Sequence, residues 1–197
     1  MARPSWDDYF MRYAYLAATR ATCPRRHVGA VIVDPSHRVV ATGYNGAPPG
    51  VPSCDEIGCQ MVENHCVRTL HAESNALDYA GTRLAQNCTL YVTITPCWDC
   101  AKRIINAKVM RVVYDEHYES RYGQSMAVPE YLREHGIEVE RFEETRMARF
   151  KQLLTLLDTP VDIADVHVGK TAVAPESCAI HRFANDVCVM CGTSDRD

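Results

Sequence analysis

The chain has 197 residues, 47% hydrophobic and 23% charged, which is typical of a globular protein and excludes a wholly disordered chain. Its 21 basic and 25 acidic residues give a formal net charge of -4, which argues against a nucleic-acid partner. No apolar run approaches the roughly 20 residues that span a bilayer and the N-terminus lacks the apolar core of a signal peptide, so we expect no membrane partner and a cytoplasmic location.

The first predicted elements are a helix and a hairpin. The helix is capped by Ser5 and continues to about Thr19, and strands at 28–33 and 38–42 follow it. The next stretch, 43–65, is irregular and rich in Gly, Pro and Cys. Because a compact domain seldom keeps such a long loop without a purpose, we expect a function or a metal ion to order it.

The rest of the domain is predicted to alternate between helices and strands. The expected elements are helix 71–80, strand 88–94, helix 97–107, strand 109–114, helix 129–134, strand 137–142 and helix 143–157. This alternation predicts an α/β layered domain over residues 1–157. Residues 158–177 have weak periodicity and are predicted to be a linker, and 178–197 form a cysteine-rich tail.

The segments His71-Ala72-Glu73 and Pro96-Cys97-Trp98-Asp99-Cys100 carry the groups that a hydrolytic zinc site needs. One imidazole and two thiolates can hold zinc and leave a fourth position for water, whose pKa the metal lowers to about 7. Glu73 is a spare carboxylate that can take a proton from this water and return it to a leaving amine. The pattern is typical of zinc deaminases of nucleobases.

Helix starts are expected to bring these ligands together. Cys97 and Cys100 lie in the opening turn of helix 97–107, where Pro96 is tolerated and the helix dipole favours thiolates. His71 opens helix 71–80. One alternative is a closed structural zinc site, against which the accompanying Glu73 and Pro96 argue. The other is a thioredoxin-like dithiol, which would not require His71 and Glu73 upstream or the many other cysteines.

Five segments in order resemble the deoxycytidylate deaminases of the cytidine deaminase superfamily, over about residues 5–145. They are Cys23–Val33, Gly43–Gly46, Cys66–Leu77, Tyr91–Lys102 and Val112–Tyr118. The resemblance implies a three-layer fold with a five-stranded mixed sheet between helices. It also implies hydrolysis of dCMP to dUMP and ammonia, which supplies the precursor of dTMP.

The resemblance also assigns roles to residues. His71, Cys97 and Cys100 match the family's catalytic zinc ligands, and Glu73 matches its proton shuttle. Asn45 matches a residue that contacts the sugar, and Tyr118 matches a tyrosine near the base and phosphate. Ala72 is a further substrate contact. Without the resemblance, Asn45 is equally well a turn residue before Gly46. Tyr118 is then an ordinary amphipathic surface tyrosine.

Many members of this family are hexamers that dCTP activates and dTTP inhibits, so the resemblance implies a homo-oligomer and nucleotide effectors, with Mg²⁺ accompanying the effector. The loop Gly43, Tyr44 and Gly46 takes part in that control. The chain departs from several relatives at Thr82, where they carry a basic residue; the nearest here is Arg83.

A second zinc site is expected around the long loop, as in many family members. Cys23 and Cys54 match two of its ligands, and Cys59 and Cys66, or His65, would complete a tetrahedral set. The alternative is a group of buried free thiols, since cysteine is among the most buried residue types.

The tail lies outside the resemblance. Its two spaced pairs, Cys178 with His181 and Cys188 with Cys191, predict a small zinc knuckle, because a piece this short has no core of its own. The alternative is a disordered tail with chance cysteines.

Two other functions remain open at this point. The first is deamination of another cytosine nucleotide or nucleoside, including a modified dCMP, or of adenine or a polynucleotide. The second is a zinc-stabilised binding protein that uses the tail and has lost catalysis. The intact Glu73 argues against the second.

Overall fold

The computed structural model describes residues 3–63, 65–84, 87–118 and 127–142, and the backbone of 183–184 and 187–188. The chain divides into two compact units, Met1–Asp158 and Thr159–Asp197. In the second unit, β8 (Phe183–Ala184) pairs antiparallel with β9 (Val187–Cys188). The predicted helix 143–157, the predicted linker 158–177 and the remainder of the tail lie outside the described residues.

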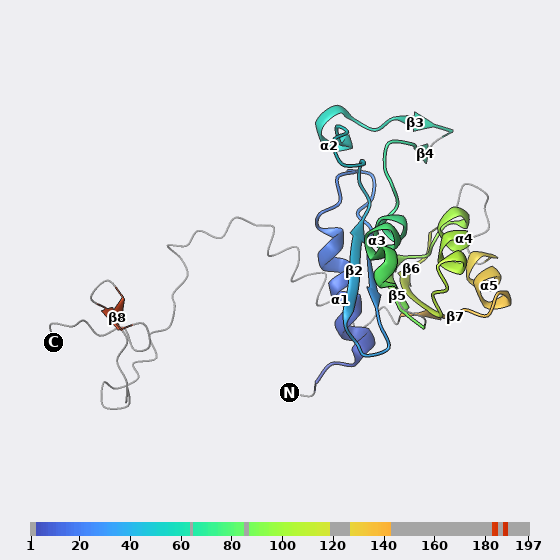
Figure 1. Ribbon diagram of the computed structural model, residues 1–197. Coiled ribbons are helices and arrows are strands. Elements are labelled where there is room, and N and C mark those ends of the chain that lie inside the picture. The colour runs from blue at the N-terminus through green and yellow to red at the C-terminus, as the bar shows by residue number, and fades with distance from the viewer. Residues whose placement is uncertain are drawn as a thin grey trace. The chain divides into compact units, whose positions relative to one another are not determined.

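The first unit contains a five-stranded sheet with helices on both faces (Figure 1). Its helices are α1 (Trp6–Ala18), α2 (Cys54–Ile57), α3 (Ala72–Ala80), α4 (Trp98–Asn106) and α5 (Ala127–Glu134), with a 3-10 turn η1 (Gly81–Arg83). The strands are β1 (Gly29–Val33), β2 (Val39–Tyr44), β3 (Met61–Val62), β4 (His65–Cys66), β5 (Thr89–Ile94), β6 (Arg111–Glu116) and β7 (Glu138–Arg141).

The sheet has the strand order β2-β1-β5-β6-β7. β1 is antiparallel to both β2 and β5, whereas the pairs β5-β6 and β6-β7 are parallel. The predicted five-stranded mixed sheet is therefore confirmed. Among the described residues, no helix is long and apolar enough to cross a membrane.

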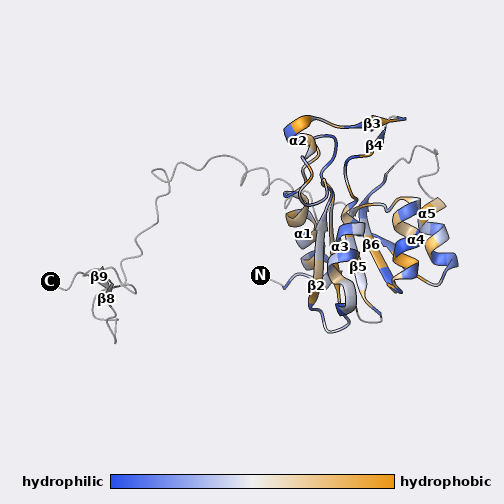
Figure 2. Cartoon of the chain, turned by 45° about the horizontal axis from the view of Figure 1, so that its top comes forward, coloured by the Kyte–Doolittle hydropathy of each residue, from blue (hydrophilic) through white to orange (hydrophobic). Residues whose placement is uncertain are grey.

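The core has one layer on each side of the sheet. Val31 and Val33 of β1 pack with α1, and Ala30 and Ile32 of the same strand pack with the core that α3, α4 and α5 cover. Successive side chains of a strand point to opposite faces, so a fully apolar strand serves both layers. Figure 2 shows hydrophobic and hydrophilic sides along α4 and α5, as expected for helices with one face on the sheet.

The first helix begins as the sequence predicts. The Ser5 hydroxyl accepts a hydrogen bond from the Asp8 amide at 3.1 Å, and the Asp8 carboxylate accepts one from the Ser5 amide at 3.2 Å. This reciprocal capping satisfies two of the amides that a helix start leaves without partners.

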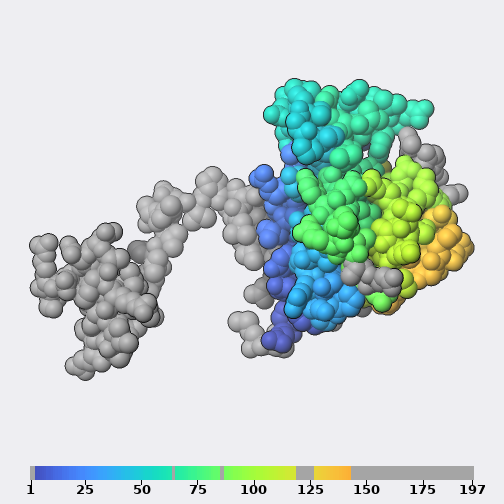
Figure 3. Space-filling view, viewed as in Figure 1, coloured from blue at the N-terminus to red at the C-terminus, as the bar shows by residue number. Residues whose placement is uncertain are grey.

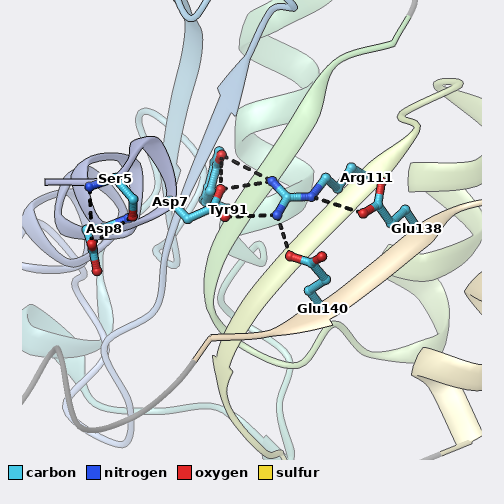
Figure 4. Close-up of polar contacts among 7 residues, drawn as sticks. All are labelled: Ser5, Asp7, Asp8, Tyr91, Arg111, Glu138 and Glu140. Atoms are coloured by element: carbon cyan, nitrogen blue, oxygen red, sulfur yellow. Dashed lines mark hydrogen bonds and ion pairs between the residues drawn. The ribbon is translucent and has the colours of Figure 1, made fainter.

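An ion-pair network fastens α1 to the sheet (Figure 4). The Arg111 guanidinium donates to both carboxylate oxygens of Asp7, each at 2.9 Å, and also to Glu140 on β7. The Tyr91 hydroxyl donates to Asp7 at 2.7 Å. The hydrogen bond from Arg111 holds the pKa of Asp7 below its ordinary value, so this carboxylate stays charged at neutral pH.

Two glycines let helices approach the sheet closely. A Cβ on Gly29 would lie 1.8 Å from the Ala14 carbonyl oxygen, and one on Gly43 would lie 2.2 Å from that of Ala72. Only a residue without a side chain fits such contacts with helix backbone. The contact at Gly43 fixes the N-terminus of α3 against β2, and that N-terminus is part of the site described below.

The stretch 43–65 is more regular than the sequence predicts. β2 extends to Tyr44, α2 begins with a capping box between Ser53 and Glu56, and β3 pairs with β4. We call residues 51–63 and 65–68 the cysteine lobe. Its elements of two to four residues leave no periodic pattern in the sequence, which is why they were not predicted. Figure 3 shows the lobe above α3.

Candidate active site

Three potential metal ligands meet at the starts of two helices. His71 is the N-cap of α3 and Cys97 is the N-cap of α4, both with extended backbone, and Cys100 lies in the first turn of α4. The prediction that Pro96 sits in the helical turn is wrong, because α4 begins at Trp98 and Pro96 precedes the cap. The end of β5 at Ile94 brings the chain to this point.

The distances among these ligands fit a tetrahedral zinc ion. The His71 Nδ1 atom lies 3.3 Å from the Cys97 Sγ and 3.4 Å from the Cys100 Sγ. Sulfur and nitrogen ligands at zinc distances of about 2.3 and 2.0 Å are roughly 3.5 Å apart. The two thiols and one imidazole therefore have both the chemistry and the spacing for zinc.

The electrostatics of the trio favour a charged sulfur. Hydrogen bonds from Cys100 and His71 lower the pKa of Cys97 to about 4. In turn, the hydrogen bond to Cys97 raises the pKa of His71 to about 9. The site thus stabilises a thiolate, the form of cysteine that binds metal ions.

Glu73 lies in the first turn of α3, close to these ligands but outside the cluster. Its side chain is almost completely buried, at 3% exposure. Burial raises the pKa of Glu73 to about 7. A carboxyl with this pKa can both accept and release a proton at neutral pH, which is the property of a general acid and base.

Glu73 and two of the ligands, His71 and Cys97, line a cavity of about 250 Å³. The predicted substrate contacts Asn45, Ala72 and Tyr118 all line it. The remaining lining residues are Cys23, Arg25, Arg26, Val28, His65, Cys66, Thr69, His71, Glu73, Ile94, Thr95 and Cys97. Substrate-contacting roles stay predictions, but the structure places all three residues at one cavity.

Asn45 uses its side chain to shape the cavity wall. Its Oδ1 accepts a hydrogen bond from the Val28 amide at 2.7 Å, and its Nδ2 donates to the Arg26 carbonyl at 2.8 Å. The side chain therefore holds the chain before β1 against the end of β2. It is more than the turn residue that Asn before Gly46 suggests.

The predicted effector loop contacts α3 and the segment before it. Gly43 packs against the start of α3, the Asn75 side chain donates to the Tyr44 carbonyl at 2.7 Å, and Gly46 pairs with Leu70 through two backbone hydrogen bonds. Gly43 is therefore explained by its close packing against α3, and Gly46 by its backbone pairing with Leu70. The effector role of the loop stays a prediction.

A second cluster consists of Cys23, Cys54, Cys59 and Cys66. The Cys23 and Cys59 sulfurs are 3.8 Å apart and those of Cys54 and Cys66 are 3.6 Å apart, close to the roughly 3.8 Å expected for tetrahedral zinc thiolates. His65, the other predicted candidate, is not in the cluster. Its ring lies against His71, with centroids 5.8 Å apart.

The remaining predicted ligands belong to the tail. Cys178, His181 and Cys191 lie outside the described residues, and only the backbone of Cys188 is described, in β9. The predicted tail zinc is therefore untested.

Six cavity residues were not predicted as site residues from the sequence. They are Arg25, Arg26, Val28, Thr69, Ile94 and Thr95. A signal was present, since the two arginines follow a predicted ligand, Cys23, and Thr69 precedes His71 by two positions. These three residues lie in segments that carry the family resemblance, Cys23–Val33 and Cys66–Leu77, but no spacing or periodicity there marks them as cavity residues.

The comparisons with known proteins agree with this geometry. Residues 4–116 match the model of the cytidine and deoxycytidylate deaminase zinc-binding region. The chain is 41% identical over 150 residues to the ComE operon protein 2 of Bacillus subtilis, covering 75% of this chain and 76% of that protein. It is 42% identical over 156 residues to the deoxycytidylate deaminase of Saccharomyces cerevisiae, which covers 76% of this chain but about half, 48%, of the yeast protein.

A solved structure is similar as well. The dCMP deaminase of cyanophage S-TIM5, determined in complex with dCMP and dUMP, superposes with a TM-score of 0.60 at 30% identity. The match covers 72% of this chain and 100% of the phage chain.

Proposed function

Because the chain belongs to the cytidine and deoxycytidylate deaminase family, we propose that it hydrolyses dCMP to dUMP and ammonia. One observation carries the proposal: Glu73, a buried carboxyl with a pKa near neutrality, lines a cavity together with His71 and Cys97 of the His-Cys-Cys metal cluster. The similarity to the yeast and cyanophage dCMP deaminases supports dCMP as the substrate.

The proposed metal ligands are His71, Cys97 and Cys100. A zinc ion bound there would lower the pKa of a water molecule and stabilise negative charge on the oxygen that becomes bonded to C4 of cytosine. The extended N-cap backbones and the helix starts hold the three ligand side chains in place.

Glu73 moves the protons in the proposed mechanism. Its carboxylate takes one proton from the attacking water and delivers it to N3 of the base. It then takes the remaining proton from the new hydroxyl on C4 and delivers it to the amine, so that the C4–N bond breaks, ammonia leaves and the C4 carbonyl forms. These steps need a group that gains and loses a proton at neutral pH, and burial gives Glu73 that property.

The neighbouring side chains orient the substrate in this proposal. Ala72 and Ile94 form an apolar part of the cavity wall. Asn45 and Tyr118 would then contact the sugar and the base or phosphate, as in the family that the sequence resembles.

Further features belong to the same proposal. The four cysteines of the second cluster would hold a structural zinc, as their spacing supports. Activation by dCTP, inhibition by dTTP, Mg²⁺ with the effector, a hexamer, a tail zinc, a cytoplasmic location and a supply of dTMP precursor are proposed from the sequence resemblance and composition alone.

The test is ammonia release from dCMP, CMP, deoxycytidine and dCTP in parallel, with zinc measured per chain. We expect dCMP to give the highest kcat/KM and at least one zinc per chain. If another cytosine compound gives a higher kcat/KM, that compound replaces dCMP as the proposed substrate. No release from any compound by the zinc-loaded protein would support a binding protein without catalysis.

A further inference from the structure

The two cysteine ligands of the first cluster differ in their surroundings. Cys97 is the N-cap of α4 and is half-buried, whereas Cys100 lies three residues further along the chain and is 1% exposed. Because water does not reach the Cys100 sulfur, groups of the protein must stabilise its negative charge. The Cys100 thiolate therefore needs a hydrogen-bond donor within the fold.

Ser74 provides such a donor. Its Oγ atom lies 3.8 Å from the Cys100 Sγ, within hydrogen-bonding reach of a sulfur atom. No other hydrogen bond of the Ser74 side chain is found among the described residues. A hydroxyl beside a thiolate is the donor, since the thiolate has no proton to give. The contact joins the first turn of α3 to the first turn of α4.

The other polar neighbours of Cys100 do not supply this donor when the trio holds a metal ion. His71 and Cys97 are then fellow ligands, so their own nitrogen and sulfur are engaged. Glu73 places further negative charge near the Cys100 sulfur. Ser74 is buried at 8% exposure and does not line the cavity, so a substrate would not displace its hydroxyl from the sulfur.

We propose that Ser74 is a positioning residue that donates a hydrogen bond to the Cys100 thiolate and thereby tunes the first metal site. The bond holds the Cys100 side chain in one orientation and draws electron density from its sulfur, which keeps the site electron-poor, as hydrolysis requires. Adjacent residues of α3 thus have separate tasks, since Glu73 lines the cavity and Ser74 supports a ligand. The inference rests on the proposed function, because it assumes that the trio binds zinc.

The first test replaces zinc with cobalt(II), whose bonds to thiolates absorb in the near ultraviolet. In Ser74→Ala the Cys100 sulfur keeps more electron density, so we expect the sulfur-to-cobalt band to shift to longer wavelength. Ser74→Thr retains a hydroxyl and should keep the wild-type band. The four-cysteine cluster contributes equally to every variant, so difference spectra isolate the trio. An unchanged band in Ser74→Ala, or the same shift in Ser74→Thr, would overturn the proposal.

Thr93→Val is the matched control for the loss of a buried hydroxyl. Thr93 is 4% exposed, and its Oγ1 accepts a hydrogen bond from the Gly29 amide at 3.2 Å instead of contacting a sulfur. This variant should unfold at a lower temperature than wild type and leave the cobalt band in place. If Thr93→Val shifts the band as much as Ser74→Ala does, the band reports a loosened fold and the proposal fails.

Metal affinity and kinetics give a second readout. Competition with a chromogenic chelator should show that the trio of Ser74→Ala binds zinc about 10- to 100-fold more weakly than that of wild type. In zinc-saturated protein, kcat for dCMP should fall about tenfold, while KM stays within about twofold because Ser74 does not line the cavity. A raised KM with unchanged kcat would assign Ser74 to substrate binding and contradict the proposal.

The cobalt spectrum and the metal affinity need no turnover, so they separate this inference from the proposed function. If the wild-type protein deaminates no cytosine compound but Ser74→Ala shifts the band and weakens metal binding, the proposed function fails and the role of Ser74 stands. If the wild-type protein deaminates dCMP and Ser74→Ala matches it in spectrum, affinity and kcat, the reverse holds.

Discussion

The two cysteine clusters of this protein have similar ligand spacing but very different surroundings. The His71, Cys97 and Cys100 trio lies where helix starts meet the main sheet, above a continuous apolar core. At the second site the cysteines themselves form the small hydrophobic core. Cys23, Cys54 and Cys66 are buried together, and Cys59 packs against them. Nearby apolar side chains of the lobe, such as Ile57 at 57% exposure, are largely in solvent.

This difference separates two ways of building a metal site. In the first, helices and strands hold the ligand side chains in position without the metal, and the metal ion serves catalysis rather than folding. In the second, the sulfurs and any metal they bind supply most of the folding free energy of the surrounding loop. We therefore expect changes at the first site to affect turnover, and changes at the second to affect local order.

The largest expected effect is the loss of turnover in Glu73→Gln. The amide has nearly the same shape but cannot carry a proton, so the rate should fall by about 10²- to 10⁴-fold while zinc content and unfolding temperature stay near wild type. Steady-state ammonia release and metal analysis measure both. Retention of more than about a hundredth of the wild-type rate would refute the role of Glu73.

Metal removal should distinguish the two clusters by their dynamics. After chelation we expect backbone amides of the cysteine lobe to exchange with solvent about a hundredfold faster, because that segment has little other stabilisation. Amides of β1 and β5 should change little, since both strands are buried in the sheet. Hydrogen exchange with mass spectrometry gives both values. If amide exchange in β5 becomes faster by the same factor, the fold around His71, Cys97 and Cys100 also depends on bound metal.

A smaller effect is expected from Gly43→Ala, which tests the scaffold of the first cluster. The new Cβ would lie 2.2 Å from a backbone oxygen of α3, so the helix must shift. We expect the free energy of unfolding to fall by about 2 kcal/mol, the usual cost of overpacking, and turnover to fall with it. Urea denaturation measures the change. Thr42→Ala, on the same strand with an exposed side chain, serves as the control, and equal stability of the two variants would contradict the close contact.

The smallest effect concerns Asp7, which is far from both clusters. Its pKa lies below the ordinary value of 3.8 because Arg111 binds the carboxylate. A lowered carboxyl pKa stabilises the folded state above pH 3.8 and loses that contribution as pH falls through the folded-state pKa. Asp7→Asn should therefore unfold more easily at pH 7, by about 1 kcal/mol or less because the pair is partly exposed, and this difference from wild type should shrink as the pH falls below 3.8.

Thermal unfolding at several pH values tests this prediction, with Glu134→Gln as an exposed control. Neither variant should alter zinc content or lobe exchange. A stability gap that persists unchanged at low pH would mean that the charge of Asp7 is not its source.

The sequence predicted the first cluster well because its signals are local. His71 with Glu73, and Cys97 with Cys100, are spaced for a helix start, and apolar runs marked the strands on either side. Helix α1 was likewise predicted from Ser5 and its acidic first turn. The one local error, the place of Pro96, arises because a cap residue and a first-turn residue look alike in a sequence.

The cysteine lobe could not be predicted to the same depth. Whether Cys59 or His65 joins the second cluster depends on the path of a chain whose elements are only two to four residues long. Arg26 and the Asp7 to Arg111 pair were missed for a related reason. Their partners lie far away in the chain, at Tyr118 and across 104 positions respectively, and single-sequence patterns do not report such contacts.

The most direct test of the central claim is deamination of dCMP in water enriched in heavy oxygen. Zinc-loaded protein should convert dCMP to dUMP that carries the heavy isotope at C4, with one ammonia released for each dUMP formed, and chelation should stop the reaction until zinc is restored. Unlabelled dUMP, or an undiminished rate in the zinc-free protein, would contradict zinc-dependent hydrolysis at His71, Cys97 and Cys100.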